Sequence, residues 1–187
     1  GQRVLLRLPG EAKSLTLLAW VRVDALPQPS TMLLASDELI GDGAETNKET
    51  PPDWRALRWD LRASGGIGFN LLSLTSATES STAGTNATPP LLTAERLGQW
   101  LCLAVAVDAA RGEVTQFING VAISRHAVAA RDWPALAHLS LGNLSMTDTE
   151  ARAGVSYGFF GAMDELVIAT RAFSAAELRR YYEVGRP

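Results

Sequence analysis

The sequence predicts an all-β fold in which two antiparallel sheets pack face to face and one short helix ends the chain. Three observations predict it. Short segments in which apolar and polar residues alternate recur along the 187-residue chain, and this alternation is typical of β-strands. Asn119-Gly120 is the sequence of a tight hairpin turn. Helical signals gather only near the C-terminus, which argues against helices placed between parallel strands.

The clearest strand pattern covers residues 55–62. Its apolar residues alternate with Asp60 and the two arginines that flank it, so we expect one buried face and one face in water. Residues 15–24 and 100–108 are apolar on both faces, as expected for strands in the middle of stacked sheets. Further strands are expected at residues 4–8, 32–35, 67–72, 114–118, 121–124, 139–141 and 163–169.

Residues 174–184 carry the signals of the single helix. Ser174 at its start and Glu177 three residues later form a capping box. Phe173 precedes the cap and is placed to pack onto Leu178. The glycine that follows residue 184 is expected to end the helix.

One face of this helix is apolar. Leu178, Tyr181 and Tyr182 fall at helical spacings and form a stripe. Because so short a helix is marginal in water by itself, we expect the stripe to pack on the sandwich.

Two long insertions interrupt the strand pattern. Residues 37–53 hold six acidic residues and one lysine, which leaves a local charge of −5, and their glycines and prolines indicate a loop. Residues 73–90 hold nine Ser or Thr among 18 residues without periodicity. We expect this second insertion to be a hairpin tip or a loop along the surface.

The order of these segments resembles a known family. Residues 161–166 read Gly-Ala-Met-Asp-Glu-Leu and residues 171–174 read Arg-Ala-Phe-Ser, Trp100 opens a long apolar strand, and Asn119-Gly120 ends another. Over nearly the whole chain this pattern is similar to the laminin-G-like jelly-roll domains of the concanavalin A-like lectin/glucanase superfamily. The resemblance implies a two-sheet antiparallel jelly-roll sandwich. The acidic insertion departs from the family pattern, which has a shorter loop there.

A narrower resemblance concerns residues 33–71, which are similar to versions of the domain attached to bacterial FecR-like transmembrane regulators. It implies a periplasmic or cell-surface location as part of a membrane-anchored or exported protein. We expect residues 1–187 to form a single laminin-G-like β-sandwich domain, a fragment of a larger envelope protein. A monomer is expected.

Composition excludes several classes of function. The net charge of −3 gives no basic surface for nucleic acid. The longest apolar stretches are far shorter than the roughly 18 to 20 residues of a membrane-spanning helix. Cys102 is the only cysteine, so no disulfide forms within the chain, and we expect it to be a buried thiol.

The same superfamily contains glycoside hydrolases, which need two carboxylates across one cleft. Their usual Glu-x-Asp-x-x-Glu pattern is absent. Asp164 and Glu165 are adjacent, so on a regular strand they point to opposite faces. His126 and His138 lie twelve residues apart without neighbouring ligands at zinc spacing. We therefore expect no enzymatic activity.

Three aromatic residues outside the clean strands are candidates for stacking on a sugar ring: Trp54, Trp133 and Tyr157. Trp54 follows two prolines and Trp133 precedes one, whereas Tyr157 lies between Ser and Gly. The alternative interpretation is that both tryptophans anchor their own loops to the sandwich.

Calcium is the one cofactor that the sequence leaves open. Carboxylate oxygens suit this ion, and the candidate ligands are Asp42, Asp53 and Asp164. The spacing of an EF-hand is missing. The alternatives are a solvated acidic loop and, for Asp164, a carboxylate that bonds loop backbone.

Three functions remain open from the sequence. The first is a non-catalytic extracytoplasmic module that recognises carbohydrate or cell-envelope glycan. The second is a protein-interaction or spacer domain of a membrane-anchored signalling regulator, with an envelope protein as partner. The third is a degenerate glycoside hydrolase.

Overall fold

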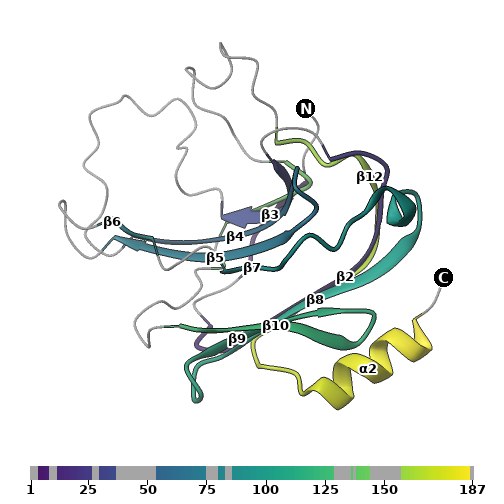
Figure 1. Cartoon of the computed structure of the whole chain (residues 1–187). Coiled ribbons are helices and arrows are strands. Elements are labelled where there is room, and N and C mark those ends of the chain that lie inside the picture. The colour runs from purple at the N-terminus through teal and green to yellow at the C-terminus, as the bar shows by residue number, and fades with distance from the viewer. Residues whose placement is uncertain are drawn as a thin grey trace, which may run out of the picture.

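The described part of the protein forms two stacked antiparallel sheets and a C-terminal helix, as the computed structural model shows (Figure 1). This confirms the fold class expected from the sequence. The structure describes residues 4–8, 12–26, 30–36, 54–74, 80–82, 86–128, 136, 138–143 and 157–185. No helix within these ranges is long and apolar enough to cross a membrane.

The larger sheet has seven strands. Along the main path its order is β1-β11-β3-β4-β5-β6, and β7 pairs with β5 beside that path. The strands are β1 (Val4–Leu6), β11 (Leu139–Leu141), β3 (Ser30–Ser36), β4 (Trp54–Arg62), β5 (Ile67–Leu74), β6 (Ser80–Thr82) and β7 (Asn86–Ala87). The strands β6 and β7 fall in the Ser/Thr-rich insertion, so that segment adds strands to the sheet and is not only a loop or a hairpin tip.

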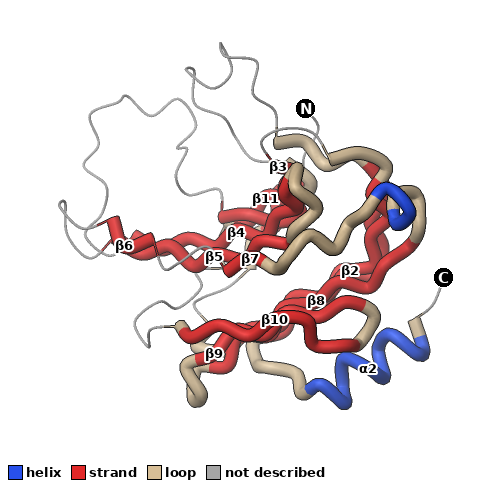
Figure 2. Tube along the Cα trace, viewed as in Figure 1, coloured by secondary structure: helices blue, strands red, loops and turns tan. Residues whose placement is uncertain are grey.

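The smaller sheet has five strands in the order β10-β9-β8-β2-β12. These strands are β10 (Val121–Ala127), β9 (Glu113–Ile118), β8 (Trp100–Asp108), β2 (Leu15–Val23) and β12 (Gly161–Ala169). One short 3-10 helix, η1 (Ala94–Arg96), lies between β7 and β8 in the sequence. Figure 2 shows the two sheets as separate layers of strands.

The main core fills the space between the layers. On β2, Leu17, Ala19 and Val21 face this core, whereas the residues between them face the other side of the sheet. The larger sheet contributes Trp59 and Phe69, which are fully buried. Burying one such side chain contributes about 1.5 to 3 kcal/mol to folding, so the apolar strand faces explain why the two sheets stack.

The β9–β10 hairpin turns at Asn119 and Gly120, as the sequence predicts. Both residues adopt positive φ, at 51° and 75°, which a two-residue hairpin turn of this kind requires. Asn119 also accepts a hydrogen bond on Oδ1 from the Cys102 backbone N–H at 3.0 Å. A methyl group on Gly120 would lie 2.8 Å from Arg179 Cα, so the glycine also lets the C-terminal helix pass close to the turn.

That helix is α2 (Ala175–Val184), and the predicted capping box is formed. Glu177 N–H donates to Ser174 Oγ at 3.3 Å, and Ser174 N–H donates to Glu177 Oε2 at 2.8 Å. Arg171 donates to Glu177 Oε1 at 2.7 Å. The two bonds between Ser174 and Glu177 satisfy backbone N–H groups that a helix start leaves without partners, and the bond from Arg171 holds the Glu177 carboxylate.

The apolar stripe of α2 packs on the outer face of the smaller sheet. Leu178 is buried there in a cluster that includes Trp20 and Cys102. Tyr182 stacks on Trp20 with ring centroids 5.7 Å apart, and Tyr181 stacks on Phe173 at 5.4 Å. Burial raises the pKa of the Cys102 thiol to about 12. The expectation of a buried thiol is confirmed.

Candidate functional site

The helix α2 does not cover the outer face of the larger sheet, because it packs on the opposite side of the molecule. In Figure 1 the smaller sheet lies between the larger sheet and α2, which packs below the smaller sheet. The outer face of the larger sheet is the face that points away from the smaller sheet. The ribbons of β4 and β5 curve so that the outer face is concave. The side chains that β4 and β5 place on this face include charged and polar groups.

Three charged residues form a row along this face of β4: Arg58, Asp60 and Arg62. The residues between them are buried in the main core, so alternation places the row on the outer side. The sequence predicts that this side of β4 faces water, and at Asp60 the prediction is wrong. Asp60 is only 8% exposed, and both arginines are half-buried.

The row continues across to β5. Asp60 is paired with Gly68 and Arg58 with Asn70 in the strand register. A Cβ atom on Gly68 would meet Asp60 Oδ1 and would lie 3.3 Å from Arg62 Nε. The missing side chain at position 68 therefore leaves the space that the Asp60 carboxylate occupies and that the Arg62 guanidinium borders.

Several polar groups on this face lack partners within the described part of the chain. Asp60 Oδ1 and Asn70 Oδ1 are buried and accept no hydrogen bond from the described residues. Among the described residues, the guanidinium groups of Arg58 and Arg62 form no ion pair or hydrogen bond. A buried polar atom without a partner costs about 1 to 3 kcal/mol. Each such atom needs an explanation, and a ligand that supplies the missing donors is one.

The charges on the face act on one another. Burial raises the pKa of the Asp60 carboxyl above its ordinary value, because desolvation disfavours the charged form. Arg62 and, more weakly, Arg58 act in the opposite direction. The attraction of the two arginines therefore does not fully compensate for the burial of Asp60.

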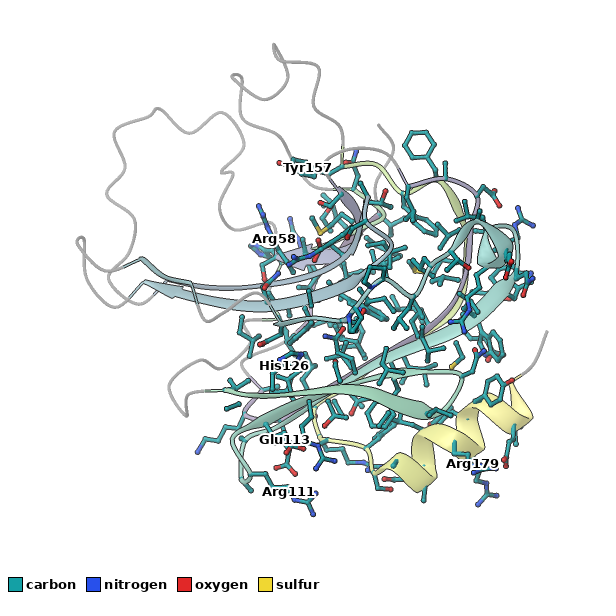
Figure 3. All side chains as sticks on the ribbon, viewed as in Figure 1. Arg58, Arg111, Glu113, His126, Tyr157 and Arg179 are labelled. Atoms are coloured by element: carbon teal, nitrogen blue, oxygen red, sulfur yellow. The ribbon has the colours of Figure 1, made fainter. Side chains whose placement is uncertain are left out.

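Tyr157 is the predicted sugar-binding residue that the structure brings to this face. Its ring packs against Met32 and Ala35 of β3, which are paired with Asp60 and Arg58 on β4. Its carbonyl accepts a hydrogen bond from Met32 N–H at 2.9 Å. In Figure 3, Tyr157 and Arg58 lie on the same side of the larger sheet. A half-buried ring thus borders the row of charges.

The structure does not describe the side chains of the other two predicted aromatic residues. Trp54 begins β4, but its side chain lies outside the described part of the chain. Trp133 also lies outside it, and so do the predicted calcium ligands Asp42 and Asp53.

The third predicted calcium ligand, Asp164, belongs to β12 of the smaller sheet and is exposed. Its Oδ1 accepts a hydrogen bond from Glu165 N–H at 2.8 Å, so it bonds backbone, as one alternative proposed. Within the described ranges, no three His, Cys, Asp or Glu side chains gather closely enough to hold a metal ion.

The strand is irregular at this point, which corrects one step of the sequence argument. The β12–β2 register shifts between Asp164 and Val167, and Glu165 adopts a φ of 49°. Simple alternation therefore does not describe residues 164 and 165. The Glu165 carboxylate lies beside the end of α2, where a Cβ atom on Gly185 would come within 2.8 Å of Glu165 Oε2.

Sequence reasoning missed the row on β4 as a site. The available signal was an acidic residue between two arginines at alternate positions, followed by Gly68 and Asn70 on the next strand. This signal is weak because it also fits a solvated strand face. The two histidines of the chain do not belong to this row. His126 lies on β10 between the two sheets (Figure 3), and His138 is exposed.

Solved structures of the same fold include several that are named for glycan recognition. The CBM40 module of the Ruminococcus gnavus IT-sialidase, bound to α2,3-sialyllactose, is 16% identical with a TM-score of 0.61, over 97% of this chain and 98% of that chain. A sialidase from Streptococcus pneumoniae is 16% identical with a TM-score of 0.60, over 94% of this chain but only 26% of that chain.

A pentraxin also shares the fold. The native heptameric SAP-like pentraxin from Limulus polyphemus is 13% identical with a TM-score of 0.59, over 96% of this chain and 74% of that chain. A search of the curated proteins found no match. The family model Laminin_G_3, described as the concanavalin A-like lectin/glucanases superfamily, matches residues 5–179, and the chain therefore belongs to this family.

Proposed function

We propose that the chain is a non-catalytic carbohydrate-binding module and that its glycan lies on the outer face of the larger sheet. The observation that carries the proposal is Asp60, a residue that is only 8% exposed on an outer sheet face and whose Oδ1 accepts no hydrogen bond from the described residues. Glycans present hydroxyl groups that donate to such acceptors. Asn70 Oδ1 offers a second acceptor on the neighbouring strand.

The surroundings of Asp60 suit a sugar ring. Arg58 and Arg62 provide donors in a planar arrangement, and Tyr157 provides an aromatic ring at the border of the face. Apolar contact with a ring together with a few placed polar groups is the usual composition of a small-ligand site. The structure of the Ruminococcus gnavus module, which holds sialyllactose, supports the same use of this fold.

The proposal is tested by measuring binding of the purified protein to a panel of immobilised glycans. We expect at least one glycan to bind, and Asp60→Ala and Asn70→Ala to weaken that binding by about tenfold or more, as for lost hydrogen bonds to buried groups. The control is Arg180→Ala on the exposed face of α2, which should leave binding unchanged. No binding by the folded wild type, or equal binding by all variants, would overturn the proposal.

Absence of catalysis belongs to the same proposal. The Glu-x-Asp-x-x-Glu pattern of the related hydrolases is missing from the sequence, and a glycoside hydrolase needs a pair of carboxylates across the cleft. Incubation of the protein with every glycan that it binds, followed by chromatography of the products, should return the glycan uncleaved. Cleavage that disappears in Asp60→Asn would show an enzyme.

We also propose that the module works outside the cytoplasm, attached to a FecR-like envelope regulator. Residues 33–71 carry that resemblance. In a host that expresses the full-length protein with its natural flanking sequence, a tag on this domain should become accessible to protease once the outer membrane is opened. Protection of the tag until the inner membrane is lysed would overturn this location.

A second candidate function is protein interaction through the edge of the larger sheet. The edge strand β1 exposes Val4 and Leu5 by more than half of their surface, and an open edge with apolar side chains can accept another strand. Substitution of both residues by Thr should then abolish binding to the parent protein's partner while glycan binding on the outer face is unchanged.

A further inference from the structure

The charges of the described row on the outer face do not balance, and this imbalance narrows the class of glycan. The described row holds two arginines and one acidic residue: Arg58, Asp60 and Arg62. A guanidinium group stays protonated at every physiological pH. The row therefore carries a net charge of about +1 when Asp60 is ionised and +2 when it is protonated.

Arg62 is the arginine that compensates for Asp60. Its Nε and the Asp60 carboxylate both border the position that a Cβ atom on Gly68 would take. Arg62 also has the larger of the two arginine effects on the Asp60 carboxyl. Asp60 thus interacts more strongly with Arg62 than with Arg58, although the two side chains form no ion pair.

Arg58 has no ion-pair partner among the described residues, and its effect on Asp60 is the weaker of the two. It lies two residues before Asp60 on β4, and its partner in the strand register is Asn70, which is neutral. Its side chain is half-buried, and it forms no ion pair with the described residues. A cation that is partly removed from water is stabilised most by a paired anion. A carboxylate fits the guanidinium fork with two parallel hydrogen bonds.

We propose that the face selects glycans that carry a carboxylate, such as sialic or uronic acids, and that Arg58 binds the carboxylate while Asp60 and Asn70 accept hydrogen bonds from neighbouring hydroxyls. This inference rests on the proposed function. The inference adds the charge of the ligand and the residue that recognises this charge. Tyr157 at the border of the face stacks on the ring that bears or precedes the acidic group.

Two pairs of ligands that differ only in charge test the inference by calorimetry. The first pair is α2,3-sialyllactose and lactose, and the second is an oligogalacturonate and its methyl ester. We expect the acid of one pair to bind about 10- to 100-fold more tightly than its neutral counterpart, which is the range of one charge-assisted hydrogen-bonded contact. The pair that shows the preference distinguishes sialic from uronic acid.

Variants then assign the preference to Arg58. Arg58→Gln should bind the acid and its neutral counterpart equally, and Arg58→Lys should keep part of the preference because it retains the charge but loses the fork. Asp60→Asn should bind the acidic glycan more tightly than the wild type does, because a negative charge that repels the acid is removed. Its affinity for the neutral sugar should not increase. The matched control is Arg125→Gln on the other sheet. In the wild type the Arg125 guanidinium pairs with Glu113 at 3.1 Å.

The outcomes separate the inference from the proposed function. If neutral and acidic glycans bind equally to the wild type and Asp60→Ala weakens both, the face binds glycans and the inference is wrong. An acid preference that survives in Arg58→Gln also overturns it. If the folded wild type binds no glycan, or if binding ignores Asp60 and Asn70, the proposed function itself fails.

Discussion

Asp60 and Gly68 occupy paired positions on β4 and β5, and the carboxylate of Asp60 lies where a side chain on residue 68 would be. This relationship joins the fold to the candidate site. The glycine is not required by backbone conformation, since it is not among the residues with positive φ. It is required by space.

Gly68→Ala should therefore displace the Asp60 carboxylate. Forcing an extra methyl group into a packed position costs about 1 to 3 kcal/mol of folding free energy, and glycan binding should fall with it. Chemical denaturation measures the first effect and calorimetry the second. In an Asp60→Ala background the same methyl group has room, so Gly68→Ala should then cost little. An equal cost in both backgrounds would show that the clash is with something else.

Asp60 should also make the stability of the protein depend on pH. Its pKa in the folded protein is raised from the ordinary value of 3.8, so the folded state binds the proton more tightly than the unfolded state does. By linkage, its contribution is most favourable below that ordinary value and is lost as the pH rises through the raised pKa. Asp60→Asn should then be more stable than the wild type at neutral pH.

The advantage of Asp60→Asn should shrink as the pH falls, because the wild-type carboxyl becomes neutral as well. Urea denaturation of both proteins between pH 4 and pH 7 measures the difference. A difference that stays constant across this range, or that has the opposite sign at neutral pH, would contradict the prediction.

The cap and the packing of α2 should contribute unequally to stability. Leu178 is buried against the smaller sheet, so Leu178→Ala should cost about 2 to 5 kcal/mol through lost burial and the remaining cavity. Ser174→Ala removes only the cap and should cost about 1 kcal/mol. Urea midpoints at a constant m-value rank the two. A harmless Leu178→Ala would mean that the helix does not depend on docking.

Glu177 gives the helix start its own dependence on pH. Its hydrogen bond from Arg171, followed by those from Ser174, lowers the pKa of this carboxyl from 4.5 to about 2. The stabilisation is therefore present above pH 4.5 and is lost as the pH falls through about 2. Glu177→Gln should remove this acid-dependent step. Thermal melts of both proteins at pH 2 and pH 6 should differ less at pH 2.

The local features of this chain were predictable from its sequence because their causes are local. The capping box needs only Ser174 and Glu177, which are three residues apart. The hairpin needs only Asn119 and Gly120, which tolerate positive φ. The alternation that identifies β4 arises from the period of a strand. Interactions between near neighbours in the sequence decide each of them.

The candidate site depended on the tertiary structure, because register and burial join residues that are distant in the sequence. Alternation places Asp60 on a face of β4 but does not show that this face is buried. Nothing local predicts that Gly68 stands opposite Asp60 or that Tyr157 packs beside them. The same holds for Gln116, whose amide donates to the Asn86 carbonyl between the two sheets at 2.7 Å.

The sequence by itself thus determined the fold class, the hairpin, the helix and the family resemblance, since these follow from periodicity and from motifs of a few residues. Only the tertiary structure decided which polar residues gather on one face and lose water there. The physical reason is that desolvation depends on everything packed around a group. For Asp60, that environment comes from strands far apart in the chain and turns a residue expected in water into the centre of a site.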